Sequence, residues 1–340
     1  MSNSDYGRFP VAHGGVVSEQ WFSATPSAVH AVEVAIRWRS FWQANALEAV
    51  SAAQEGLSRD LGGLTRTLQG VDLNRRLHPR LVARVASLME AMSRGDGFAV
   101  YDGVQAWISD PADHWYADQW VVESVASHPW EASIVKEIRS TRIPGQPAIQ
   151  CLPLLTSDLS LIAAHVERAM AHIAEVDPGM HGEILTHVAS IRMLEGSGME
   201  GMSTPRAFGA IWLRIPEPGG ELAWYLEQLV HECSHLHLNA LLAMDPLLLN
   251  PDEINQSPIR PDPRPMFQIL HGTFVLFRNC RVHGRLSLHA PELGLEPMLA
   301  RFREQFAKGM EVLQKHARPT PLGVRLIQSM LSEGAFPGEA

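Results

Sequence analysis

The feature that most constrains this chain is a pair of histidines inside a long helical pattern. The motif His231-Glu232-Cys233-Ser234-His235 lies within the run Glu221 to Met244, whose apolar spacing predicts one continuous helix. Two histidines four residues apart lie about 40° apart around a helix, so both imidazoles face one spot. We therefore predict that His231 and His235 bind a metal ion. The alternative is a pair of core histidines whose nitrogens are satisfied by hydrogen bonds.

Apolar residues surround this motif on both faces of the helix. Leu226, Leu229 and Leu236 belong to a stripe on the side opposite the histidines, and Leu238 and Leu242 continue the histidine face. A helix that is apolar all round is buried. We therefore expect the two imidazoles to meet the interior rather than bulk water.

A metal site needs a third ligand, and the sequence offers two kinds. The long metzincin form of the motif is excluded, because it needs Gly and His where this chain has Leu238 and Leu241. We favour His271, which lies inside an apolar helical run. The alternative is a carboxylate, Asp252 or Glu253, from a Pro-rich loop.

Two arginines lie in this Pro-rich loop just before His271. The loop runs from Asn250 to Pro265 and contains Arg260 and Arg264. A guanidinium group matches a carboxylate with two parallel hydrogen bonds, and neighbouring prolines reduce the cost of ordering it. We expect one of the two arginines to bind a ligand carboxylate. An ion pair with Asp262 is the alternative for either one.

The arrangement of apolar residues and breakers predicts an α+β fold that is mostly helical, with a small sheet packed beside the buried motif helix. The densest Pro/Gly punctuation of the first half, Arg142 to Pro147, divides a mainly helical N-terminal region, 1–145, from a catalytic region, 146–340. The expected helices are Ser27 to Leu57, Pro79 to Ser93, Asp118 to Val125, Asp158 to Val176 (stopped by Asp177-Pro178-Gly179), Glu221 to Met244, Met266 to His283, Leu295 to Ala317 and Leu322 to Gly334, and the expected strands are His187 to Leu194 and Phe208 to Ile215.

Composition limits the partners. The formal net charge of −9 argues against nucleic acid and anionic membranes, which both need clustered Lys and Arg. No apolar run reaches the ~18 residues of a membrane span, and Met1 to Gly14 lacks the pattern of a secretory signal. Cys151, Cys233 and Cys280 are too widely spaced for a disulfide framework. We therefore expect a cytoplasmic protein.

The segment from about His187 to His283 resembles the HExxH-type, 2-oxoglutarate- and Fe(II)-dependent peptide β-hydroxylases, which modify ribosomally made precursor peptides in natural-product (RiPP) biosynthesis. The resemblance rests on elements that follow one another in a fixed order. These are Phe208-Gly209-Ala210-Ile211-Trp212-Leu213, the motif run Leu229-Val230-His231-Glu232-Cys233-Ser234-His235-Leu236, Asp262-Pro263-Arg264-Pro265 and Leu270-His271-Gly272.

This resemblance implies a dioxygenase with Fe(II) at His231, His235 and His271, and with 2-oxoglutarate and O2 as co-substrates. One of Arg260 and Arg264 would hold the far carboxylate of 2-oxoglutarate. The reaction would hydroxylate the β-carbon of a residue in a precursor peptide and release succinate and CO2. The helical N-terminal region is then a candidate for binding the peptide.

The alternative class is a zinc-dependent peptidase or amidase that shares the same motif. There Glu232 is the general base that activates a zinc-bound water. In the oxygenase Glu232 orients the site instead. A peptide-binding module that keeps only a relic of the site is a third class.

Overall fold

The computed structural model describes residues 17–141, 148–154, 159–218, 221–257, 259 and 262–333. Within the chain, contacts define two compact units. The first unit comprises Met1–Val34, Leu161–Thr186 and Pro216–Ala340, and the second comprises Ala35–Ser160 and His187–Ile215. The boundary expected at residues 142–147 lies outside the described residues, so the division into 1–145 and 146–340 stays a prediction.

The second unit contains a small mixed sheet with the strand order β1-β2-β4-β3. The strands are β1 (Val121–Ser124), β2 (Ser190–Leu194), β3 (Gly201–Ser203) and β4 (Ala210–Arg214). β1 and β4 pair with β2 in parallel, and β3 pairs with β4 antiparallel. All of β2 and most of β4 are buried, as is usual for parallel strands covered on both faces.

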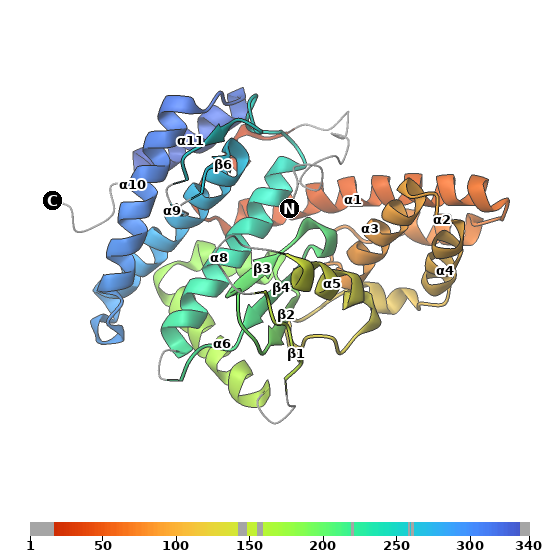
Figure 1. Cartoon of the computed structure of the whole chain (residues 1–340), viewed down its shortest axis with the longest axis horizontal. Coiled ribbons are helices and arrows are strands. Elements are labelled where there is room, and N and C mark those ends of the chain that lie inside the picture. The colour runs from red at the N-terminus through yellow and green to blue at the C-terminus, as the bar shows by residue number, and fades with distance from the viewer. Residues whose placement is uncertain are drawn as a thin grey trace. The chain divides into compact units, whose positions relative to one another are not determined.

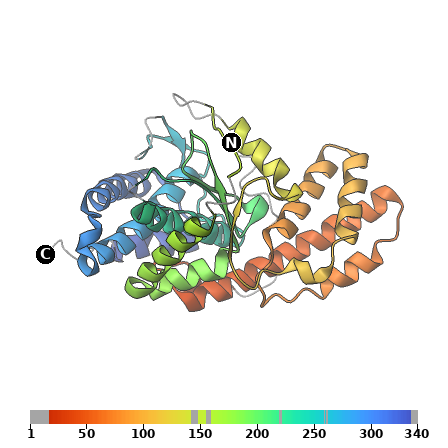
Figure 2. The same cartoon turned by 90° about the horizontal axis from the view of Figure 1, so that it is seen from below.

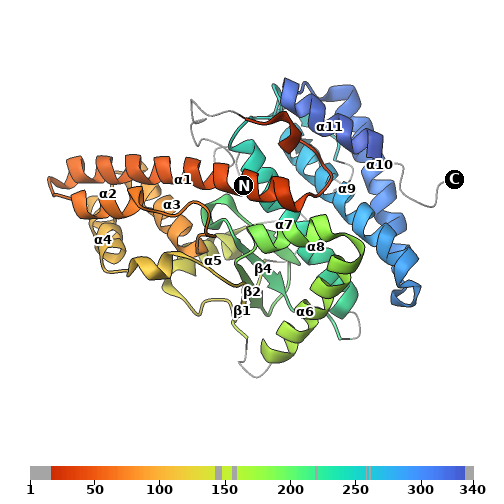
Figure 3. The same ribbon diagram turned by 180° about the vertical axis from the view of Figure 1, so that it is seen from behind.

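Except for the helix Ala132–Ser140, the helices of the second unit gather along the later part of α1 (Ala28–Leu57), as Figure 3 shows. Side chains of α1 anchor the neighbouring segments: Arg39 donates to the Leu73 carbonyl at 3.0 Å and Gln43 to the Leu68 carbonyl at 2.7 Å. The other helices of this unit are α2 (Gly62–Gln69), α3 (Pro79–Ser93), α4 (Gly97–Ile108) and α5 (Ala132–Ser140), with short 3-10 turns at Ala112–Trp115, Pro129–Glu131 and Pro205–Ala207.

The first unit is built from helices, and α9 is at its centre. α8 packs against α9, and α10 packs against α9 along its length (Figures 1 and 2). A short hairpin, β5 (Ile254–Asn255) with β6 (Arg264–Pro265), precedes α9. The helices are α6 (Leu159–Val176), α7 (Pro178–His187), α8 (Glu221–Leu242), α9 (Met266–His289), α10 (Glu296–His316) and α11 (Pro321–Glu333).

The helices and the small sheet confirm the predicted α+β, mostly helical class. The motif helix α8 belongs to the first unit and the sheet to the second. No helix in the described part of the chain is both long and apolar enough to cross a bilayer.

One local prediction is wrong, and one predicted helix end is confirmed at Val176 but is followed by a helix that was not predicted. The run Asp118 to Val125, expected to be helical, contains strand β1, because its residues pair with β2. Asp177-Pro178-Gly179, expected to end a helix, also begins one: Pro178 opens α7, and the Asp177 carboxylate accepts from the Met180 backbone N–H at 3.1 Å. Proline suits the first helical turn, where its missing N–H costs nothing.

Candidate metal centre

The histidine motif lies on α8, as the sequence predicts, and His271 lies on the neighbouring helix α9. α8 and α9 pack against each other, so three histidines from two helices meet. His231 and His235 are half-buried, and His271 is buried with 7% of its surface exposed. The structure therefore brings together the three residues expected to bind the metal.

The three imidazoles form a row with His235 in the middle. His235 Nε2 lies 3.2 Å from His231 Nε2, and His235 Nδ1 lies 3.3 Å from His271 Nδ1. The His235 and His271 rings are stacked, with centroids 5.6 Å apart. Each of these contacts joins two ring nitrogens, so each needs either a proton or a cation between them.

The spacing of His231 and His235 fits a shared metal ion. Imidazole nitrogens lie about 2.0–2.1 Å from a bound zinc ion, and octahedral or tetrahedral angles then place two of them about 2.8–3.4 Å apart. The 3.2 Å between the two Nε2 atoms falls in this range. The pair can hold one ion without any change in the backbone.

The third histidine fits less directly. Among the described residues no three His, Cys, Asp or Glu side chains form a group that could hold a metal ion. The reason is that His235 turns Nε2 to His231 and Nδ1 to His271. His271 reaches the same ion only by turning its ring. In its present orientation, His271 Nδ1 can accept a hydrogen bond from the Nδ1–H of His235. This keeps His235 Nε2 unprotonated and able to bind the metal.

Burial keeps these imidazoles neutral. Desolvation lowers the pKa of His231 and of His271 to about 4, and it lowers the pKa of His235 well below its ordinary value. Metals bind neutral imidazole. The site therefore needs no deprotonation step near pH 7.

The loop carboxylates, the alternative third ligands, are placed differently. Asp252 and Glu253 are both exposed. Glu253 accepts from Asn250 Nδ2 at 2.8 Å and from Asn255 Nδ2 at 3.3 Å. These hydrogen bonds, the one from Asn250 first, lower the pKa of Glu253. Glu253 thus helps to order the loop.

Of the two expected arginines, Arg260 lies outside the described residues. Arg264 is half-buried on β6 and forms an ion pair with Asp262, with Nη2 2.6 Å from Oδ2. Its Nη1 donates to Gln268 Oε1 at 3.3 Å. This is the ion pair that the sequence left open as the alternative, so a ligand carboxylate has to compete with Asp262 for Arg264.

Gly272 lets the loop approach the metal centre closely. A Cβ atom at this position would lie 2.6 Å from Ile259 Cδ1. The Ile259 side chain therefore rests on the α9 backbone directly beside His271. A larger residue here would displace the end of the Ile259 side chain, which is 42% exposed.

Glu232, the remaining motif residue, is buried with 2% of its surface exposed. Gln228 is also buried, and it lies on the same side of α8 as His231 and His235, three residues before the motif. Sequence reasoning did not single out Gln228. Its position at the helical spacing of the histidines was the available signal.

A buried charge network fixes α8 and α9 next to the histidines. Arg278 of α9 pairs with Glu183 of α7, and both are 1% exposed or less. His237 of α8 places Nδ1 3.7 Å from Glu183 Oε2, and Arg278 Nε donates to the Ala24 carbonyl at 3.1 Å. Sequence spacing does not reveal this network, because its members are far apart along the chain.

Comparison with known proteins leaves the family open. No protein-family model matches this chain, and no curated protein is significantly similar to it.

Proposed function

We propose that this protein is a 2-oxoglutarate-dependent non-haem iron dioxygenase that hydroxylates the β-carbon of a residue in a ribosomally made precursor peptide. The observation that carries the proposal is the row of three neutral imidazoles on two packed helices, in which the Nε2 atoms of His231 and His235 lie at a distance that suits a shared metal ion. The third histidine, His271, is the histidine of the Leu-His-Gly element, which follows Asp-Pro-Arg-Pro in the order on which the resemblance rests.

In this proposal His231 and His235 hold Fe(II) through Nε2, and His271 completes the protein ligands. Bound iron supplies the chemistry of O2, and the balance is one peptide C–H, one 2-oxoglutarate and one O2 to one C–OH, one succinate and one CO2. Glu232 orients the site from its buried position. The apolar surroundings of α8 and α9 keep bulk water away from the reacting groups.

Arg264 is the side chain proposed to bind the far carboxylate of 2-oxoglutarate. Hydrogen bonds to charged groups contribute roughly 1.5–3 kcal/mol each. Arg264→Ala should therefore raise the half-saturating concentration of 2-oxoglutarate by about one to two orders of magnitude while iron still binds. Arg318→Ala, at an exposed position of the same unit, is the matched control and should leave this concentration unchanged. Equal values in the parent protein and Arg264→Ala would remove Arg264 from the site.

The reaction is tested with protein purified without oxygen. It is loaded with Fe(II), mixed with 2-oxoglutarate and a candidate precursor peptide, and then exposed to air while peptide mass and succinate are followed. The proposal expects a gain of one oxygen per peptide with one succinate. Peptide cleavage that needs Glu232 but not 2-oxoglutarate would instead establish the zinc peptidase or amidase.

A further inference from the structure

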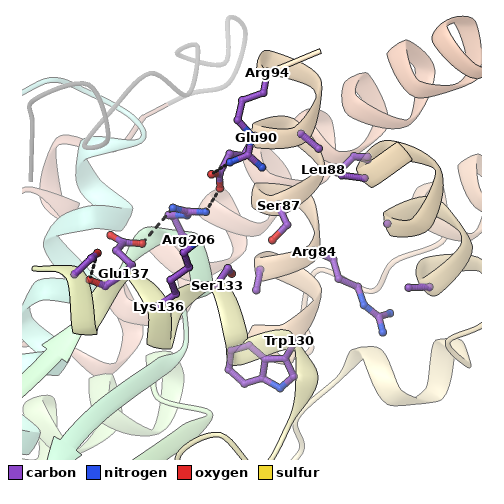
Figure 4. A pocket seen from close by; sticks show the side chains of 16 residues that line it. Arg84, Ser87, Leu88, Glu90, Arg94, Trp130, Ser133, Lys136, Glu137 and Arg206 are labelled. Atoms are coloured by element: carbon purple, nitrogen blue, oxygen red, sulfur yellow. Dashed lines mark hydrogen bonds and ion pairs between the residues drawn. The ribbon is translucent and has the colours of Figure 1, made fainter. Parts of the chain in front are cut away.

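The second unit contains a cleft that none of the metal-centre residues line. It lies between α3, α4 and α5 and has a volume of about 480 Å³, a size typical of ligand sites. Figure 4 shows Trp130 at one end of the cleft, and Arg206 between Glu90 and Glu137 at the other.

Small side chains on three helices create this space. Ala83 and Ala91 of α3, Ala99 and Gly103 of α4, and Ser133 of α5 all line the cleft. None of them is large enough to fill it, whereas a closed apolar void of this size would destabilise the fold. Ser133 is exposed, so the cleft opens to solvent. The space is therefore accessible to the side chain of a ligand.

Ion pairs fix the separation of the walls. Arg206 pairs with Glu90 of α3, and its Nη1 lies 3.1 Å from Glu137 Oε2 of α5. Arg94 adds a second pair to Glu90 at 2.6 Å. Because the bridge exists before any ligand arrives, binding does not have to order these side chains.

The rest of the lining carries surplus positive charge. Lys136 is exposed and forms no ion pair with another described residue. Arg84 lies 2.5 Å from Asp110 but shares this carboxylate with Arg80 at 3.5 Å. In a chain with a formal net charge of −9, a locally positive cleft selects an anionic ligand.

Trp130 gives the same cleft an apolar end. Its ring is half-buried and is held edge-on by Trp212 and His78, with centroids 6.3 and 6.2 Å away. Arg192 lies over the ring at 5.8 Å. A rigid aromatic surface at the end of a pocket is a typical anchor for an apolar side chain.

We propose that this cleft binds an acidic segment of peptide, with an apolar side chain directed to Trp130 and a neighbouring carboxylate paired with Lys136. The choice of a peptide rests on the proposed function, because a precursor peptide is the substrate there. The cleft then holds a part of the peptide other than the residue that is hydroxylated. The anionic and apolar features of the ligand rest on the cleft alone.

Fluorescence anisotropy tests this with a labelled synthetic octapeptide in which aspartate alternates with phenylalanine and leucine. One analogue has lysine in place of aspartate, and another has serine in place of the apolar residues. Full-length protein is used without iron or 2-oxoglutarate, so binding is measured apart from the reaction. We expect the acidic apolar peptide to bind at least about tenfold more tightly than either analogue.

Variants locate the binding. Lys136→Glu should weaken binding by about tenfold or more, and Ser133→Trp, which fills the cleft, should abolish it. Lys315→Glu makes the same charge change at another exposed lysine and should change affinity by less than about twofold. Circular dichroism checks that each variant is folded, and Lys136→Glu alone is a sufficient test because its position is exposed.

Three results would overturn the proposal. The first is equal affinity of Lys136→Glu and the parent for the acidic peptide, and the second is equal affinity of the parent for the acidic and basic peptides. The third is displacement of the peptide by N-acetylphenylalanine at the affinity of the whole peptide, which would identify a site for a small acid. If a variant that no longer binds peptide in the cleft still hydroxylates the peptide, the cleft proposal is wrong and the proposed reaction stands. If the cleft binds the peptide but no hydroxylation occurs, only the proposed reaction is wrong.

Discussion

The candidate metal centre in α8 and α9 and the cleft between α3, α4 and α5 hold polar groups in opposite ways. At the candidate metal centre the groups are neutral imidazoles, and α9 also carries Arg278, whose ion pair with Glu183 is almost entirely enclosed. In the cleft they are charged and partly open, and the side chains of Arg206 and Glu90 are 26% and 38% exposed.

This difference indicates what each region can tolerate. A buried charge depends on its partner, because water cannot replace that partner. A partly exposed ion pair contributes little to stability, because water competes for both members. The enclosed ion pair of α9 is therefore required for the fold, whereas the ion pairs of the cleft contribute little to its stability.

Removing one arginine from each region tests the comparison most strongly. Arg278→Ala leaves Glu183 buried without its guanidinium partner and should lower the free energy of unfolding by about 3–5 kcal/mol. Arg206→Ala should lower it by no more than about 1 kcal/mol. Urea unfolding followed by circular dichroism measures both values. Equal losses would contradict the contrast between the two regions.

The comparison can be sharpened inside the first unit, where a buried and an exposed candidate ligand lie close in sequence. His271→Ala should weaken Fe(II) binding by about a hundredfold, at the upper end of the effect expected even for a residue that only orients a ligand. Glu253→Ala should change Fe(II) binding by less than about twofold. Competition with a chelator under nitrogen measures both. A larger effect at Glu253 would move the third ligand to the loop.

A smaller effect is expected from pH at a buried histidine away from the metal. Burial lowers the pKa of His283 to about 4, and its Nδ1–H donates to the Asn279 carbonyl at 3.0 Å. The unfolded chain binds this proton near pH 6.5, so the stabilising effect of neutral His283 is present above pH 6.5 and is lost as pH falls toward 4.

Between pH 7 and pH 5 this amounts to about 2 kcal/mol from His283 alone. His283→Gln keeps a donor but does not titrate, so its unfolding free energy should fall by about 2 kcal/mol less than that of the parent over this range. Identical pH dependence in the two proteins would show that burial does not lower the pKa of His283.

The spacing of apolar residues predicted the two helices of the site, but it did not predict how they pack against each other. α8 and α9 follow from apolar spacing, and the shared face of His231 and His235 follows from helix geometry. The ring orientation of His271 depends on how α9 packs against α8 and on Phe267, whose ring meets it at a centroid distance of 6.2 Å. Sequence spacing carries no information about this packing.

The errors have the same cause. β1 forms because Val121 lies opposite Ser190 of β2, and its own residues do not reveal that distant pairing. The Glu183–Arg278 pair joins α7 to α9. The sequence pattern predicted α9 but not α7. Contacts between distant segments decided these features, whereas residue propensity decided the long helices.

The central claim is that His231 and His235 bind the metal, and metal content tests it most directly. His231→Ala and His235→Ala, each reconstituted with one equivalent of Fe(II) under nitrogen and then desalted, should retain almost no iron while their circular dichroism spectra match that of the parent. The parent should retain close to one iron per chain. Full iron occupancy in either folded variant would contradict the account, because the 3.2 Å contact between the two Nε2 atoms would then serve packing alone.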